Sequence, residues 1–325
     1  MPLAEARETA RVLRKIAREG GDPIAERDKG KREVPTFQKA AETVHAEHSP
    51  SWKNPKHAAQ WINTLKQYAY PALGDRPVDQ IDTPEVLRLL GPIWLTKPET
   101  ARRVRQRLGT VFDWAKASGH RTGDNPVEGV ARGLPKQTDT AKHHAALPYD
   151  EVPAFIKALR ASDSGIIAKH AFEFLILTAS RTSEVLEAQW DEIDLTAKLW
   201  TVPASRMKAG RTHRVPLSDR CVTMLKEAEA YRGKSLYLFH GRSEKKPMSN
   251  MVFSKIMKGL KFAATPHGFR SSFRDWASET TSFPREVAEM ALAHTIENKV
   301  EAAYRRGDLL EKRRKMMHDW AGFIR

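Results

Sequence analysis

The residues best suited to chemistry lie at 265–270, where Thr265 and Pro266 begin a predicted helix. His267 and Arg270 are three residues apart, so they share one face of its first turns. A helix N-terminus, an imidazole and a guanidinium would then converge on one anion, such as a phosphate. The simpler alternative is a histidine and an arginine that only pack on the helix.

Two more basic residues stand where a phosphate could be held. Arg181 follows a long apolar run. An arginine at the end of a buried helix is costly unless it meets an anion or a carboxylate such as Glu184. Lys208 lies at the tip of a predicted β-hairpin over residues 207–217, from which its ammonium could reach a phosphate and donate a proton. Taken singly, a salt bridge and an ordinary charged turn are the simpler interpretations.

A histidine and a tyrosine complete the set. His294 and Tyr304 are ten residues apart, spanning a turn and a short predicted helix. A tyrosine hydroxyl can act as a covalent nucleophile, although most tyrosines serve packing. None of these segments is specific by itself, so their order along the chain is what narrows the chemistry.

In this order the residues resemble the active-site set of the tyrosine recombinases, the phage integrase family: Arg181, Lys208, His267, Arg270, His294 and Tyr304. Over residues 33–325 the chain is most similar to integrases of satellite prophages and genomic islands. Agreement of six separated positions in order and context is more specific than any single motif. The stretches that carry the resemblance are 181–185, 267–277, 303–308 and 312–317.

The resemblance implies a covalent mechanism on DNA. Tyr304 would attack a phosphodiester and form a 3′-phosphotyrosine, while Lys208 would protonate the 5′-hydroxyl leaving group. The covalent intermediate conserves the energy of the broken bond, so rejoining needs no ATP. No cofactor and no metal are expected.

The resemblance also assigns the remaining residues of the set. Arg181 and Arg270 would hold the non-bridging oxygens of the phosphate as charge builds there. His267 would assist proton transfer at the nucleophile, and His294 would hydrogen-bond the phosphate.

Two positions depart from the family's pattern. Ala179 and Ala293 stand where relatives often have glycine. We expect these alanines to alter backbone freedom without altering the chemistry.

The hydrophobic pattern predicts a mainly α-helical chain of the α+β class. Apolar residues recur at helical spacing over residues 3–19 and 98–118, and residues 165–179 are apolar almost all round, which favours a buried helix. Thr36 is expected to cap one helix and Thr83, which precedes a proline, another. Strand signals indicate one small antiparallel sheet, at residues 193–195, 199–202 and 213–217.

The predicted helix at 98–118 is also a candidate DNA-binding surface. Its arginines are expected to lie off the apolar face and to be free to reach phosphates, although a solvated basic face is the simpler interpretation. The DNA-binding candidates are Arg102, Arg103, Arg105 and Arg107, together with Arg211 of the predicted hairpin.

The family's organisation implies four segments. Residues 1–32 would be a helix and linker left from an N-terminal arm-binding domain whose β-containing part is not expected in this chain. Residues 33–138 would form a helical core-type DNA-binding domain. A polar linker at 139–147 would lead to a mixed, mostly α-helical catalytic domain at 148–325.

The composition agrees with a nucleic-acid partner. The 325 residues include 55 Lys and Arg against 40 Asp and Glu, a net charge of +15 that favours a polyanion, although a basic membrane-surface protein would share it. A single cysteine excludes an internal disulfide and a thiolate zinc site, as in a reducing cytosol. No uncharged apolar run reaches the roughly 18 residues of a membrane span, and no secretory signal is visible.

Partners and rival functions follow from the resemblance. It implies double-stranded DNA attachment sites, a monomer in free solution, a homo-tetramer on DNA, accessory DNA-bending or excision factors, and a nucleoid-associated place in a bacterial cytoplasm. The alternatives are a type IB topoisomerase-like relaxase, a non-catalytic DNA-binding regulator on the same scaffold, and a metal-dependent nuclease. The helical region at 33–138 argues against a relaxase. The intact set of active-site residues argues against a non-catalytic regulator, and the lack of a carboxylate cluster argues against a metal-dependent nuclease.

Overall fold

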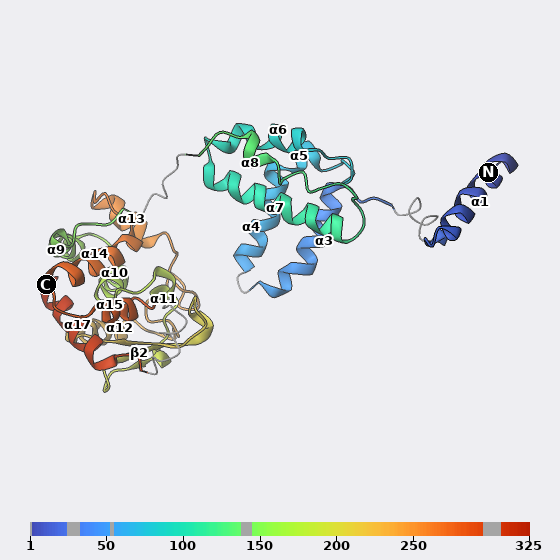
Figure 1. The fold of residues 1–325 in the computed structure, drawn as a ribbon. Helices are drawn as coiled ribbons and strands as arrows, with labels where there is room; N and C mark the ends of the chain where they lie inside the picture. Colours follow the sequence, from blue (N-terminus) through green and yellow to red (C-terminus); the bar gives the residue numbers. More distant parts are fainter. Residues whose placement is uncertain (1, 25–32, 53–54, 138–144, 295–306) are drawn as a thin grey trace. The chain divides into compact units, whose positions relative to one another are not determined.

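The computed structural model describes residues 2–24, 33–52, 55–137, 145–294 and 307–325. The chain divides into two compact units, Met1–Thr140 and Ala141–Arg325, and each is described by itself. Helices dominate both units, and the strands of the described residues belong to the second (Figure 1). The expected mainly α-helical α+β fold is confirmed.

Most helices of the first unit bury one apolar face. Phe37, Leu65 and Leu108, from three different helices, are fully buried in its core. The predicted first helix is present but contributes no buried residue. The helices are α1 (Leu3–Arg18), α3 (Phe37–His48), α4 (Pro55–Tyr68), α5 (Tyr70–Leu73), α6 (Thr83–Trp94), α7 (Pro98–Ala117) and α8 (Val130–Gly133).

Side-chain caps begin two of these helices. Thr36 accepts a hydrogen bond at 3.3 Å from the backbone N–H three residues on, which confirms its predicted role. The prediction of Thr83 as a cap was wrong by one residue, because Asp82 and Glu85 each accept a hydrogen bond from the other's backbone N–H, at 3.0 and 3.2 Å. This reciprocal arrangement satisfies two free N–H groups. The Thr83 hydroxyl donates instead to Pro126 O at 2.9 Å.

The second unit packs around the buried helix that the apolar run predicted. Every residue of α10 from His170 to Thr178 is buried. Helices α9, α11, α12, α13 and α17 all contact it, and Figure 1 shows it in the interior of this unit. The helices are α9 (Val152–Ala161), α10 (Ile166–Thr178), α11 (Thr182–Leu186), α12 (Asp219–Glu229), α13 (Val252–Gly259), α14 (Phe269–Thr280), α15 (Arg285–Ala291) and α17 (Leu310–Phe323).

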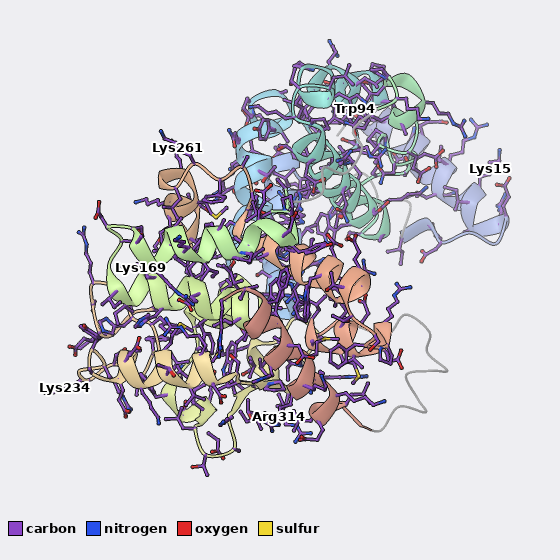
Figure 2. The ribbon with its side chains drawn as sticks, turned by 90° about the vertical axis from the view of Figure 1, so that its left-hand side faces the viewer. Lys15, Trp94, Lys169, Lys234, Lys261 and Arg314 are labelled. Atoms are coloured by element: carbon purple, nitrogen blue, oxygen red, sulfur yellow. The ribbon has the colours of Figure 1, made fainter. Side chains whose placement is uncertain are left out.

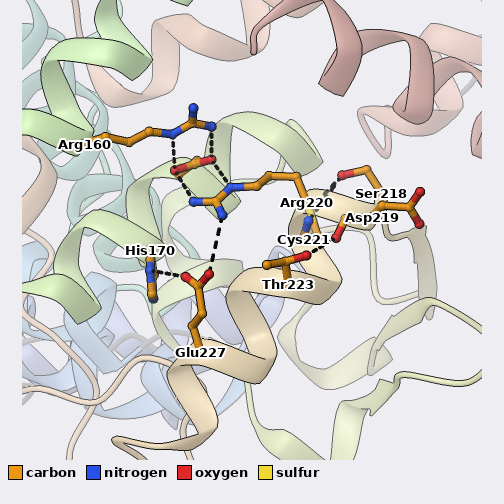
Figure 3. Close-up of polar contacts among 9 residues, drawn as sticks. Arg160, His170, Ser218, Asp219, Arg220, Cys221, Thr223 and Glu227 are labelled. Carbon is orange, nitrogen blue, oxygen red and sulfur yellow. Dashed lines mark hydrogen bonds and ion pairs between the residues drawn. The ribbon is translucent and has the colours of Figure 1, made fainter.

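One carboxylate interrupts the apolar surface of α10. Glu173 is 2 % exposed and receives two hydrogen bonds each from Arg160 of α9 and Arg220 of α12, at 2.6 to 3.2 Å (Figure 3). Burial raises the pKa of Glu173, but the two guanidinium groups outweigh it and hold the pKa below its usual value. The buried charge is therefore paired, and it links three helices.

A small antiparallel sheet lies beside these helices, as predicted. Strands β1 (Ile193–Asp194), β2 (Leu199–Val202) and β3 (His213–Pro216) are arranged in that order. Trp200 of β2 faces Val215 of β3, and both side chains are buried. The alternation along β2 turns Trp200 and Val202 toward the core.

Candidate active site

The segment before α14 is shaped by a cap and a close approach of two backbones. Thr265 Oγ1 accepts a hydrogen bond from Gly268 N at 3.1 Å, which begins the short 3-10 helix Pro266–Gly268. A Cβ on Gly268 would lie 2.2 Å from Ala145 O, so only glycine fits here. Helix α14 then starts at Phe269 and carries Arg270 in its first turn.

Arg270 is buried and joins three segments of the chain. Its Nη1 donates to Ala179 O at 2.5 Å, and its Nη2 donates to Leu292 O at 2.5 Å. Nη2 also lies 3.3 Å from His294 Nε2. Burial first, and the charge of Arg181 second, lowers the pKa of Arg270 to about 10, so the group stays charged at neutral pH.

Arg181 contacts Glu184 on α11 and the backbone that follows α15. Its Nη1 donates to Glu184 Oε1 at 2.8 Å, and the same carboxylate accepts the Arg181 backbone N–H at 2.8 Å. Its Nη2 donates to Ala293 O at 3.3 Å. The salt bridge named as the simpler interpretation is therefore present, yet 22 % of the Arg181 side chain remains exposed.

Two of the carbonyl groups that hold these arginines belong to residues with left-handed backbone. Ala179 and Ala293 both have φ of 49°. Ala179 ends α10 and offers its oxygen to Arg270, and Ala293 follows α15 and offers its oxygen to Arg181. These are the two alanines for which an altered backbone freedom is expected, and a positive φ is the conformation that glycine adopts most readily.

His294 completes the cluster. Its Nδ1 lies 2.6 Å from Glu289 Oε2, and its Nε2 faces Arg270. The ring is 40 % exposed. The structure thus brings together three of the sequence-predicted site residues and two carboxylates, Arg181, Arg270 and His294 with Glu184 and Glu289. Sequence analysis missed Glu289, whose only signal was its position five residues before His294.

The other predicted site residues, which are His267, Lys208 and Tyr304, are not part of this hydrogen-bonded cluster in the described residues. His267 is exposed on the 3-10 helix, three residues before the buried Arg270. Lys208 is exposed in the connection at 203–212 that joins β2 to β3. The hairpin predicted over residues 207–217 is therefore too short, because the strand paired with β3 ends at residue 202. Tyr304 lies outside the described residues.

The candidate DNA-binding arginines on α7 differ in what they contact. Arg102 and Arg103 both pair with Glu99, at 3.2 and 2.8 Å. Arg105 is partly buried, with its guanidinium 6.0 Å from the centre of the Trp94 ring. The remaining candidate in the predicted hairpin, Arg211, is exposed in the β2–β3 connection.

The prediction that Arg107 lies off the apolar face was wrong. The side chain is 4 % exposed and donates to Gln60 O at 3.0 Å. Position 107 follows Val104 by three residues and precedes Val111 by four, which places it on the buried stripe of the helix. Arg107 therefore holds α7 to α4 rather than a phosphate.

Helix α4 carries a feature that sequence analysis did not single out. Gln60, Asn63 and Gln67 follow Lys56 at helical spacing, and all four side chains are exposed on one face. Together with Thr64 and Thr100 of α7 they line a shallow groove. Among the described residues, the three amide side chains make no hydrogen bond within the protein. Their donors and acceptors are available to a polar partner.

Two further searches of the described residues give negative results. No group of three or more His, Cys, Asp or Glu side chains in that part of the chain is arranged to hold a metal ion. No helix there has the length and apolar character that a membrane crossing requires.

Comparison with known proteins shows what the chain is similar to. Residues 37–130 match the profile described as "Phage integrase central domain", and residues 146–309 match "Phage integrase family". "Prophage integrase IntZ" of Escherichia coli (strain K12) is 34 % identical, with the match covering 99 % of this chain and 80 % of that protein. "Integrase" of Enterobacteria phage P4 is 28 % identical over 99 % of this chain and 77 % of that protein.

The fold has solved counterparts. The structure titled "Crystal structure of a lambda integrase tetramer bound to a Holliday junction" matches with a TM-score of 0.67 and 19 % identity, covering 85 % of this chain and 82 % of that one. A Tn1549 transposon integrase in complex with circular intermediate DNA matches with a TM-score of 0.60 and 14 % identity, covering 83 % of this chain and 99 % of that one. At these identities the likeness concerns the fold.

Proposed function

The chain belongs to the phage integrase family and is a site-specific tyrosine recombinase, and we propose that it cuts and rejoins DNA through Tyr304 to integrate or excise a mobile element. In this proposal the Tyr304 oxygen attacks the scissile phosphorus, a 3′-phosphotyrosine forms, and the bond from phosphorus to the 5′ oxygen breaks. Lys208 gives its proton to the departing 5′ oxygen. The reverse attack by a 5′-hydroxyl rejoins DNA and releases the tyrosine.

The observation that carries the proposal is the convergence of Arg181, Arg270 and His294 from three segments of the chain. Within the described residues Arg270 donates three side-chain hydrogen bonds and Arg181 two, whereas a guanidinium has five N–H groups. The remaining N–H groups are available to the non-bridging oxygens. Fixed donors of this kind stabilise the charge that develops in the transition state. His267 would assist proton transfer at Tyr304.

Two sets of side chains are proposed to contact the DNA outside the cleavage site. Exposed or partly exposed arginines would bind phosphates, which contributes affinity without sequence preference. The row of amide side chains on α4, which consists of Gln60, Asn63 and Gln67, would hydrogen-bond base edges in the major groove, where Asn and Gln pair with adenine. The phosphate contacts proposed are Arg102, Arg103, Arg105 and Arg211, with Arg107 withdrawn because it is buried.

The proposed partner is a double-stranded DNA attachment site, bound by a homo-tetramer that assembles from monomers on the DNA. Lambda integrase has been solved as a dimer on a core site and as a tetramer on a Holliday junction, which supports this assembly. Accessory DNA-bending or excision factors and a nucleoid-associated place in a bacterial cytoplasm complete the proposal. Residues 33–138 and 148–325 are the proposed core-binding and catalytic domains, with 1–32 and 139–147 as the preceding helix-linker and the connecting linker.

The rival functions are not favoured. A type IB topoisomerase-like relaxase does not account for the match of residues 37–130 to an integrase central domain. A non-catalytic regulator would not need the paired arginines beside His294.

A covalent trap tests the proposed function. The protein is mixed with nicked attachment-site DNA in excess EDTA, so that the cut 5′ end is lost and the intermediate accumulates. Detergent gels then detect protein bound to DNA, and peptide mapping locates the bond. We expect an adduct at Tyr304, and none for Tyr304→Phe with DNA affinity unchanged. An adduct at another residue, or strong cleavage by the Phe variant, would overturn the assignment.

A further inference from the structure

We propose that Glu289 is a positioning residue that fixes the ring of His294 so that its Nε2 faces the scissile phosphate. The inference rests on the proposed function and deepens it. Glu289 lies on α15, and its Oε2 is 2.6 Å from His294 Nδ1. Its other oxygen, Oε1, accepts a hydrogen bond from Arg274 Nε of α14 at 2.7 Å. Both oxygens of the carboxylate are thereby held.

The backbone at the end of α15 sets the distance between the two side chains. His294 N donates to Glu289 O at 3.0 Å, and Ala293 N donates to Met290 O at 3.1 Å. With Ala293 in the left-handed region, these two bonds form a Schellman motif. The motif places the first and last of its six residues side by side, where an apolar pair usually packs. In this chain the first residue of the motif is Glu289 and the last is His294, so a carboxylate and an imidazole lie side by side.

The contacts on both ring nitrogens select the same tautomer. A guanidinium has donors and no acceptor, so the Arg270 contact with His294 Nε2 requires a lone pair on Nε2. The proton of the neutral ring is then on Nδ1, where the Glu289 oxygen accepts it. When the ring is protonated, Nε2–H becomes a donor for a phosphate oxygen, and Nδ1–H stays on Glu289.

The charges around the ring explain why a carboxylate is needed. Arg181, Arg270 and Arg274 all lie in the same cluster as His294, and Glu184 is the other acid within it. Burial raises the pKa of Glu289, but hydrogen bonds from His294 and Arg274 outweigh it and hold the pKa below its usual value. Glu289 is therefore ionised and offsets the positive charge beside His294.

The first test separates an effect through His294 from a general structural effect. Single-turnover adduct formation and DNA affinity are measured for Glu289→Ala, His294→Gln and the double variant. We expect Glu289→Ala to slow cleavage at least 10-fold with the dissociation constant for DNA within 2-fold of the original. In the His294→Gln background the same change should alter the rate less than 2-fold. Losses that multiply in the double variant would overturn the proposal.

Matched variants and a spectroscopic measurement complete the test. Glu286→Gln, on the same helix, should leave the rate unchanged, and Glu289→Asp should restore part of it. In ¹⁵N-histidine NMR of the unmodified protein, His294, identified by its loss in His294→Gln, should show a protonated Nδ1. A ring protonated on Nε2 alone would overturn the proposal even if the variants at position 289 do not fold. If the protein forms no adduct at all, the proposed function is wrong. The NMR measurement of the His294 tautomer still tests the contact with Glu289 independently.

Discussion

Ala179 and Ala293 share a left-handed backbone with φ of 49°, and each presents its carbonyl oxygen to an arginine of the site. The Cβ of any residue other than glycine clashes with the following carbonyl in this region, at a cost of about 1–2 kcal/mol. The site is therefore built on two strained turns, where glycine would allow the same geometry with less strain.

At these two residues we predict that Ala293→Gly and Ala179→Gly each stabilise the protein by about 1 kcal/mol, because relief of the clash exceeds the extra chain entropy of glycine. Urea unfolding of the variants measures the change. Ala158→Gly, inside α9, is the matched control and should destabilise by about 1 kcal/mol. Loss of stability at position 293 similar to that of the control would contradict the prediction.

His213 predicts a pH dependence of stability. Burial, and then the nearby Arg313, lowers its pKa to about 4, although Glu184 acts in the opposite direction. In the unfolded chain a histidine binds its proton near pH 6.5. Between these values the unfolded state holds more protons, so stability falls as the pH falls from about 6.5 to 4. The carboxylates whose pKa is lowered lose their contribution only at more acid pH.

We therefore expect the free energy of unfolding to decrease by about 2 kcal/mol between pH 7 and pH 5. Urea titrations at the two pH values measure it. His213→Gln should remove most of the decrease, whereas His318→Gln, at an exposed position of α17, should leave it unchanged. Equal slopes for the original protein and His213→Gln would count against this account.

At the scale of the elements, Asp308 ties the start of α17 to the sheet. Its carboxylate receives two hydrogen bonds from Arg214 of β3, both at 2.8 Å, and one from Arg313 Nη2 at 2.9 Å. Arg313 is 1 % exposed and also donates to Asp308 O and Arg214 O. Asp308 thus neutralises a buried cation and joins two elements in one contact.

For this joint we predict that Asp308→Ala destabilises the protein by about 3–5 kcal/mol, because Arg313 would be left as an unpaired buried charge. Chemical denaturation measures the loss. Asp319→Ala, which removes a more exposed pair with Lys315 on the same helix, should cost less than about 1 kcal/mol. Similar losses for the two variants would mean that burial of Arg313 is not what gives Asp308 its importance.

The base contacts proposed for α4 can be tested separately from the general affinity for DNA. Changing Gln60 and Asn63 to Ala should weaken binding to the attachment site, by roughly 1–3 kcal/mol for each bidentate pairing with a base that the change removes, with little effect on unrelated DNA. Binding to both DNAs, measured by fluorescence anisotropy, tests this. Gln106→Ala, an exposed amide of α7, is the control. An equal loss on both DNAs would assign the row to phosphate contacts instead.

At the scale of the whole molecule, the net charge of +15 governs association. Basic side chains such as Lys234 and Lys261 project from the surface of the second unit (Figure 2). Neutralising phosphates releases counterions, so the affinity for any DNA should fall steeply with salt. Like-charged copies also repel one another in free solution.

We therefore expect a monomer without DNA and a tetramer on paired attachment sites. Light scattering at physiological salt, with and without a synthetic junction that holds two sites, measures the mass directly. A second sample with DNA of unrelated sequence is the control and should show no defined tetramer. A stable tetramer in the absence of DNA would contradict the prediction.

Several features followed from the sequence alone, because they depend on neighbouring residues. The apolar period predicted α7 and the buried α10, and short alternating runs predicted the three strands. Thr36 began its helix as expected, because a cap acts within one turn. The chemistry was predicted through the family resemblance that the order of the basic residues, the histidines and the tyrosine carries, because residue type and order are read directly from the chain.

Burial and pairing were decided by the tertiary structure, because they depend on residues distant in sequence. Arg270 is held by carbonyl groups 91 and 22 residues away, and Arg181 by one that is 112 residues away. The spacing of Arg107 places it on the apolar stripe of α7, but its charge argued for exposure, and the packing of α4 against α7 decided that it is buried. Glu289 carried no motif, and only the turn after α15 set it beside His294.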